Sequence, residues 1–177
     1  MEPDWLKAEA AWCGADPARW KNTEGNADGP GPAEGLNASR QASARRAAML
    51  LRLYQLADMD GRQCLPTLIK ACQCDTAMLA MRVWRVDQAV FGTGRTGALR
   101  HVRLAAQWCG HDLESPGKAT VGWLLDERTG GARLAAWLYA IALDNGFRPS
   151  GPNPYHAHAS RAAAVPSTHH TSQRNTP

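Results

Sequence analysis

Residues 83–108 read VWRVDQAVFGTGRTGALRHVRLAAQW, and this stretch decides the predicted fold. Apolar residues in its two outer parts recur three and four positions apart, which is typical of helices that bury one face. We therefore predict one helix over about 83–90 and another over about 98–108. The second helix ends before Cys109-Gly110, because glycine is a common helix terminator. The residues between the two helices contain three glycines and form a turn.

This turn contains Gly92-Thr93-Gly94-Arg95, a sequence suited to binding an anion. Two glycines one residue apart allow the backbone to bend sharply and to approach a ligand closely. The N–H groups that begin the following helix carry roughly half a positive charge and attract phosphate. Arg95 adds a formal charge, and Thr93 and Thr96 add hydroxyl groups. The sequence therefore predicts a phosphate seat at this turn.

Gly92, Gly94 and Gly97 also match the glycine spacing of dinucleotide-binding proteins. That fingerprint requires a preceding strand within a βαβ unit, whereas the pattern before Gly92 is helical. The sequence holds none of the common motifs of serine hydrolases, P-loop enzymes or zinc proteases. A cysteine, a histidine and an aspartate lie within 109–112, but neighbours along a chain rarely form a catalytic site. We expect a non-enzymatic protein without a cofactor.

Helical periodicity continues on both sides of the deciding stretch, and no run alternates as a strand does. The predicted fold class is therefore all-α. We expect Trp108, Trp123 and Trp137 to pack in the core, and His101 to be either a core residue, which we favour, or a neighbour of a bound phosphate. The further predicted elements are a helix from Asn37 or Ser39 to about Leu56 that is stopped at Asp60-Gly61, a helix beginning near Leu65-Pro66, a short helix capped by Asp75, and a helical segment at 119–145 that is interrupted at Gly130-Gly131.

Basic charge is concentrated in the middle of the chain. The net charge is −4 over residues 1–37, +7 over 40–103, −1 over 104–150 and +2 over the remaining tail. Ten of the eleven cations in the central block are arginines, whose planar guanidinium groups match phosphate geometry. A GC-rich genome explains arginine in place of lysine, but it does not explain this segregation. Beside the turn, the predicted nucleic-acid contacts are Arg45, Arg46, Arg52, Arg82, Arg100 and Arg103.

Composition divides the chain into four parts. They are an acidic, tryptophan-containing segment with a Gly/Pro-rich linker at 1–37, a DNA-binding domain at 38–112, an additional helical segment packing on it at 113–149, and a disordered tail at 150–177. The sequence shows neither a membrane-spanning run nor an export signal, so we expect a cytoplasmic protein located at the nucleoid. The five cysteines are odd in number and lack paired zinc spacing, so we expect thiols without a metal.

Four motifs in the centre of the chain resemble a known family. They are LPTLIK at 65–70, CD at 74–75, LAMRV at 79–83 and VFGTGRTGA at 90–98. In this order and without a gap they resemble the core of the actinobacterial integration host factor, a family unrelated to the heterodimeric enteric protein of that name. The arginine-rich helix from Arg45 to Leu56 resembles the N-terminal helix of that family, so that the likeness covers about residues 45–103.

The resemblance implies a helix-two-turn-helix core with a long basic N-terminal helix. It also implies mainly sequence-independent binding of double-stranded DNA through phosphates, in a protein that shapes the nucleoid and assists recombination or regulation of transcription. Gly92, Gly94 and Arg95 match the hairpin residues that carry this binding. Phe91 stands where the family has a hairpin proline, and Gly97 where it usually has a basic residue. We expect a monomer or a weak oligomer.

A protein-interaction module is the alternative. In that interpretation the N-terminal tryptophans and the helical segment at 119–146 form the working surface, as in a phage-encoded regulator that binds a host protein. Binding of a recombinase or another host protein is also compatible with the first interpretation. Retardation of duplex DNA at low salt distinguishes the two classes, because only the first predicts it.

Overall fold

The structure is a computed structural model that describes residues 32–155, and within this range it contains helices and no strand. The predicted all-α class is therefore confirmed. The predictions for the N-terminal tryptophans and for most of the tail lie outside the described residues. The elements are α2 (Pro32–Asp60), η2 (Gly61–Gln63), α3 (Cys64–Cys74), η3 (Thr76–Ala80), α4 (Val83–Phe91), α5 (Arg95–Trp108), η4 (Pro116–Lys118), α6 (Val121–Leu124), η5 (Glu127–Thr129) and α7 (Ala132–Asp144).

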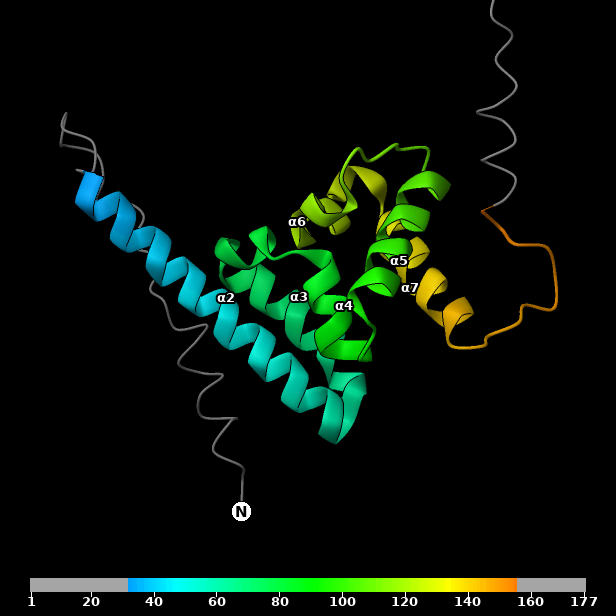
Figure 1. The fold of residues 1–177 in the computed structure, drawn as a ribbon, viewed down its shortest axis with the longest axis horizontal. Coiled ribbons are helices and arrows are strands. Elements are labelled where there is room, and N and C mark those ends of the chain that lie inside the picture. Colours follow the sequence, from blue (N-terminus) through cyan, green and yellow to red (C-terminus); the bar gives the residue numbers. More distant parts are fainter. Residues whose placement is uncertain (1–31, 156–177) are drawn as a thin grey trace, which may run out of the picture.

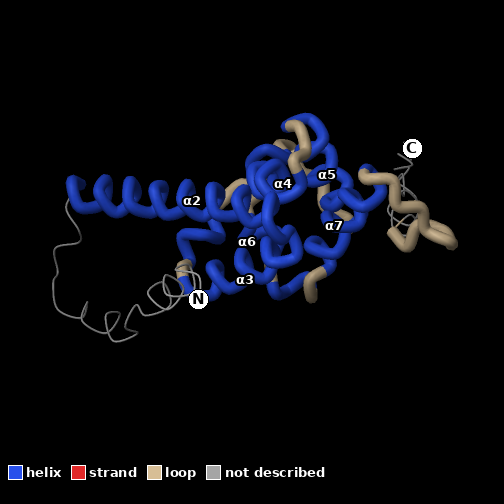
Figure 2. Tube along the Cα trace, turned by 90° about the horizontal axis from the view of Figure 1, so that it is seen from below, coloured by secondary structure: helices blue, strands red, loops and turns tan. Residues whose placement is uncertain are grey.

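Helix α2 projects from the rest of the molecule as a long rod (Figures 1 and 2). Its first buried side chain is Met49, and residues 33–48 are exposed or half-buried. The helix begins at Pro32, earlier than the predicted start at Asn37 or Ser39, so the linker prediction is wrong for 32–37. Proline suits the first turn of a helix, and Glu34 complements the helix dipole there. The projecting half lacks an apolar stripe, and hydrophobic periodicity therefore did not reveal its start.

The second half of α2 packs against α3 and α4 through Met49 and Leu53. It ends at Asp60, as predicted, and the Asp60 carboxylate accepts a hydrogen bond from the Arg62 N–H. Asp75 caps η3 as predicted, since its carboxylate accepts a hydrogen bond of 2.9 Å from the Ala77 N–H. Burial raises the pKa of the Cys72 thiol to about 11, which fits a packing role for this cysteine.

Two short backbone contacts close the middle of the fold around α4. The Val83 N–H donates to the Ala119 carbonyl at 3.1 Å, and the Val121 N–H donates to the Met81 carbonyl at 2.8 Å. They surround an isolated antiparallel bridge between Arg82 and Thr120. This pairing holds the start of α4 beside the segment that leads into α6.

Helix α7 lies beside α5, and the two share the C-terminal part of the core (Figure 1). Gly130 and Gly131 both adopt positive φ, which confirms the predicted interruption, but the chain also leaves helical geometry at Leu125. Trp137, Trp108 and the nearby apolar side chains are buried, whereas Trp123 is half-buried. In the alternative interpretation, residues 119–146 form part of an interaction surface. In the structure, most apolar side chains of this segment are buried or half-buried in the core.

The predicted disordered tail is ordered at its beginning. Tyr155 stacks on Trp108 with ring centroids 5.3 Å apart, and its ring also contacts Tyr139. Aromatic contacts of this kind stabilise a segment that its composition alone assigns to the tail. Within the described part of the chain, no helix combines the length and the apolar character that crossing a bilayer requires.

Candidate nucleic-acid interface

The glycine turn is an open hairpin between α4 and α5. Gly92 ends α4 in the left-handed region, with φ +65°, and its N–H donates to the Gln88 carbonyl at 3.1 Å. Gly94 is extended and forms the N-cap of α5. Helix α5 therefore starts at Arg95, three residues before the predicted start at Ala98. The turn is shorter than the glycine pattern suggested, because residues 95–97 form the first helical turn.

This geometry leaves backbone donors at the hairpin facing outward. The first hydrogen bond within α5 joins the Ala98 N–H to the Gly94 carbonyl, so the N–H groups of residues 95–97 precede it. Gly92, Gly94, Arg95 and Thr96 are exposed, and Thr93 is half-buried. A helix start with accessible N–H groups attracts an anion.

Gly97 lies close to the Thr93 side chain in this hairpin. A Cβ atom at this position would lie 2.7 Å from Thr93 Cγ2, a distance at which side chains overlap. The basic side chain that the resembling family usually has here would therefore displace Thr93. The structure gives a steric reason for the glycine, and Arg95 and Thr96 are left as the side chains that flank the seat.

Trp84 holds two guanidinium groups beside the hairpin. The Arg95 Cζ atom lies 5.0 Å from the Trp84 ring centroid, and the Arg85 Cζ atom lies 5.3 Å from it. Cations at this distance from an indole ring are attracted to it. Arg95 is thus drawn from the hairpin towards α4, where Trp84 also holds Arg85.

A groove between α2 and α4 gathers Arg85 and two further arginines. The part of the groove that the arginines line, which we call its basic half, has a volume of about 450 Å³. Arg46 comes from α2, Arg82 immediately precedes α4, and Arg85 is on α4. Arg82 also donates a hydrogen bond to the Lys118 carbonyl, which fixes its position. The lining residues are Ser43, Arg46, Ala47, Leu50, Ala80, Met81, Arg82 and Arg85.

The groove continues into an apolar half of about the same size. Leu50 and Arg85 line both halves, so the two form one surface, which we call the α2–α4 groove. Its apolar half has a volume of about 450 Å³ and contains two exposed α2 side chains, Leu51 (60% exposed) and Tyr54 (56% exposed). The lining residues are Leu50, Leu51, Tyr54, Trp84, Arg85, Gln88 and Ala89.

Some predicted contacts are not part of this surface. Arg45 pairs with Asp75 at 2.8 Å, and Arg100 pairs with Asp144 near the end of α7. Arg52 is seven residues after Arg45 and so lies on the same side of α2 as Arg45. Arg103 is exposed and follows Arg95 by eight residues, so both lie on the same side of α5. The structure thus gathers Arg46, Arg82 and Arg85 in one groove and places Arg95 over the same Trp84 ring as Arg85, whereas Arg45 and Arg100 are paired with acids elsewhere.

Sequence reasoning missed Trp84, Arg85 and Tyr54 as parts of the site. A signal was present, because Trp84 and Arg85 precede Gln88 by four and three residues and share the side of α4 that faces away from Val83 and Val86. Their contact with α2 could not be read from this pattern, since it depends on which face of α2 packs nearby.

A buried cluster behind the hairpin joins α4, α5 and α7. His101 is 1% exposed; its Nδ1 lies 2.9 Å from Asp87 Oδ2 and its Nε2 lies 3.2 Å from Asp144 Oδ2. Trp137 Nε1 donates to the same oxygen of Asp87 at 3.0 Å. The prediction that His101 is a core residue is confirmed. Hydrogen bonds from His101 and then from Arg100 hold the pKa of Asp144 below its usual range.

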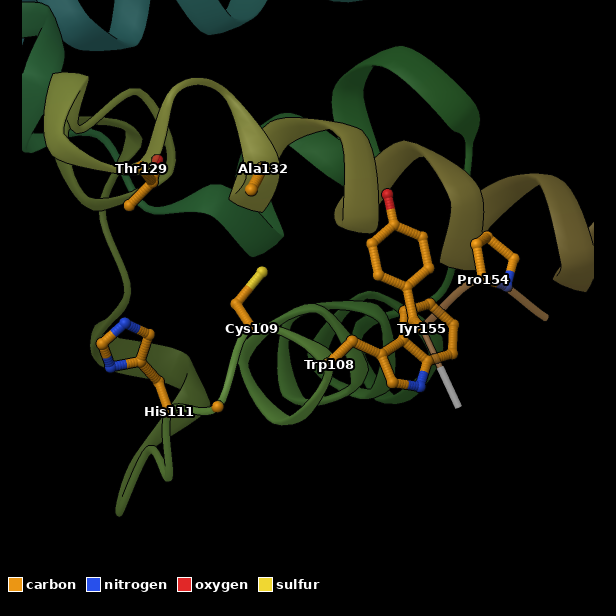
Figure 3. A pocket seen from close by; sticks show the side chains of 8 residues that line it. Trp108, Cys109, His111, Thr129, Ala132, Pro154 and Tyr155 are labelled. Atoms are coloured by element: carbon orange, nitrogen blue, oxygen red, sulfur yellow. The ribbon is translucent and has the colours of Figure 1, made fainter. Parts of the chain in front are cut away.

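Another pocket lies at the other end of α5, away from the hairpin (Figure 3). Its volume is about 610 Å³, and Cys109 and His111 both line it. His111 Nε2 lies 2.8 Å from Arg133 Nη2, so this nitrogen is occupied by a guanidinium. Burial raises the pKa of the Cys109 thiol, and the charge of Arg133 only partly opposes this effect. A thiol with a raised pKa is a poor nucleophile at neutral pH.

No protein-family model, curated protein or solved structure matches this chain. The resemblance to the actinobacterial integration host factor therefore stays a prediction. The fold and the site define an all-α protein whose exposed hairpin adjoins a groove containing arginine and aromatic side chains.

Proposed function

We propose that the protein is a non-enzymatic, architectural DNA-binding protein that grips the phosphate backbone of duplex DNA. The observation that carries this proposal is a continuous series of arginines, because Arg46, Arg82 and Arg85 line one groove and Arg85 shares the Trp84 ring with Arg95 at the open start of α5. Arginines and helix N-termini are common phosphate ligands, and phosphate contacts carry no direct sequence information. Binding is therefore mainly independent of sequence.

The hairpin and the groove have different tasks in this mechanism. The N–H groups of residues 95–97 and the Arg95 guanidinium seat one phosphate. The arginines of the basic half bind phosphates further along the strand, and the exposed part of α2 extends the basic surface. The resemblance of residues 65–98 supports a helix-two-turn-helix core and DNA bending, a nucleoid location and assistance to a recombinase, all of which belong to the proposal.

Charge reversal at the hairpin tests the proposal. Arg95→Glu should weaken duplex binding by about tenfold or more, because a charged hydrogen bond is replaced by repulsion. It should also lower the slope of log affinity against log salt by roughly 0.9 for each phosphate that the variant no longer neutralises. The measurement is gel retardation of a duplex at two salt concentrations.

Arg128→Glu is the matched control for this experiment. Arg128 is highly exposed on η5, outside both the hairpin and the groove, and its replacement makes the same change in net charge. Equal weakening by the two variants would remove the hairpin from the mechanism. If the parent protein does not retard duplex DNA even at low salt, DNA binding is wrong.

A protein-interaction module is the second candidate, and exposed apolar side chains favour it. Leu51, Tyr54 and Met59 (74% exposed) lie on α2 within nine residues of each other. Exposed apolar side chains that cluster often mark an interface. This candidate predicts that the protein ignores DNA at low salt, where the first candidate predicts retardation.

A further inference from the structure

We propose that the α2–α4 groove holds an unpaired nucleic-acid strand, so that the protein prefers DNA with a single-stranded segment. This inference rests on the proposed function and names the form of DNA that the same surface recognises. The observation behind it is that the basic half of the groove continues directly into the apolar half, which contains aromatic side chains.

Duplex DNA explains only the basic half. A duplex presents phosphates and sugars outward and keeps the faces of its bases stacked inside. Arg46, Arg82 and Arg85 therefore have partners on a duplex, whereas Leu51 and Tyr54 would stay in water. A single strand offers phosphates and base faces together, and proteins bind it with basic grooves that contain aromatic side chains.

The walls of the groove are arranged for such a strand. Tyr54 belongs to α2, while Trp84, Arg85 and Gln88 belong to α4. Because Arg85 lines both halves, a phosphate held there places its own base near Tyr54. The Trp84 ring is engaged by two guanidinium groups, so Tyr54 is the exposed aromatic ring. The Gln88 amide offers a donor and an acceptor to a base edge.

The three cations of the groove favour nucleic acid over an acidic peptide. All three are arginines, whose planar groups stack on bases as well as bind phosphates. An acidic peptide would satisfy the charges but leave the stacking surface of Tyr54 without a specific role.

The test compares three probes with the full-length protein by fluorescence anisotropy. The probes are a single strand of about 15 nucleotides, the same strand with abasic sites at its centre, and the corresponding duplex. The intact strand should bind about tenfold more tightly than the abasic strand, because base stacking adds to phosphate binding. It should also bind more tightly than the duplex.

Substitutions at Tyr54 identify the groove as the origin of this preference. Tyr54→Ala should remove the advantage of the intact strand over the abasic strand, and Tyr54→Phe should keep it, because only the ring is needed. Met59→Ala is the control, since Met59 is exposed on the same helix but lies outside the groove. Duplex affinity should be equal for Met59→Ala and the parent.

Three results would overturn the inference and leave the proposed function intact. In the first, the intact and abasic strands bind with equal affinity. In the second, Tyr54→Ala still prefers the intact strand as strongly as the parent does. In the third, polyglutamate displaces the labelled strand as effectively as unlabelled strand does. The third result would identify an acidic protein segment as the ligand of the groove. Failure of all three probes to bind would instead contradict the proposed function itself.

Discussion

His101 shows how single residues position the hairpin. Its ring lies between carboxylates from α4 and α7, while Asp87 is fully buried and retains one carboxylate oxygen without a partner among the described residues. A buried acidic group that loses one of its few partners is costly. The cluster therefore ties α5 to both neighbouring helices, and Trp137 supplies the remaining hydrogen bond to Asp87.

Replacement of His101 by Phe should destabilise the protein by about 3 kcal/mol, because Asp87 then keeps only the Trp137 N–H. Urea unfolding measures the change. Gln107→Phe is the control, since Gln107 is exposed on the same helix and its replacement should cost little. If His101→Phe were as stable as the parent, the cluster would not hold the helices together.

Asp144 makes stability depend on pH. Its pKa is lowered in the folded state, first by the hydrogen bond from His101 and also by Arg100. Its contribution is therefore complete above its unfolded value, 3.8, and is lost as pH falls through the lower folded value. The stability difference between the parent and Asp144→Asn should be larger at neutral pH than below pH 3.8. Urea midpoints at several pH values measure it, and a constant difference would contradict the assignment.

At the scale of elements, the two halves of α2 differ in how far they pack against the rest of the protein. Residues 33–48 have no buried side chain, whereas the following half contributes Met49 and Leu53 to the core. Isolated helices of this length are marginal in water, and most helix stability comes from packing.

Hydrogen exchange should therefore separate the two halves of α2. Amides before Met49 should exchange much faster than those of residues 49–60 in the free protein, and DNA should slow the former if α2 follows the backbone. Mass spectrometry after pepsin digestion resolves the halves. Uniform protection along α2 in the free protein would contradict this division.

Element boundaries follow from the sequence where the signal is local. The cap at Asp75 and the break at Gly130-Gly131 depend on neighbouring residues, and both predictions are confirmed. The predicted starts of α2 and α5 were wrong, because residues 33–36 bury nothing and residues 95–97 were assigned to the turn. The bridge between Arg82 and Thr120 joins distant segments and had no local signal.

The candidate site was likewise predictable only where its residues are neighbours in the sequence. The hairpin is local, and its glycines and Arg95 are exposed as expected. Arg45 and Arg100 carry the same charge as Arg46, but partners 30 and 44 residues away along the chain engage them. Such pairings depend on tertiary packing and could not be read from composition.

At the scale of the whole molecule, the position of the arginines matters more than their number. The net charge of +4 is modest, and the +7 central block supplies both the cations of the groove and those paired with acids. Surface ion pairs contribute little to stability, so both kinds of arginine can be neutralised without unfolding the protein.

Two triple variants of equal charge test this claim most directly, by the salt dependence of duplex affinity. The site variant replaces two groove arginines and the hairpin arginine (Arg46→Gln, Arg85→Gln and Arg95→Gln), and the control variant is Arg45→Gln, Arg100→Gln and Arg128→Gln. The site variant should bind more weakly and show a log–log salt slope smaller by up to about 3, whereas the control should keep most of the affinity and of the slope. Equal effects in the two variants would show that net charge alone binds DNA and would contradict the site.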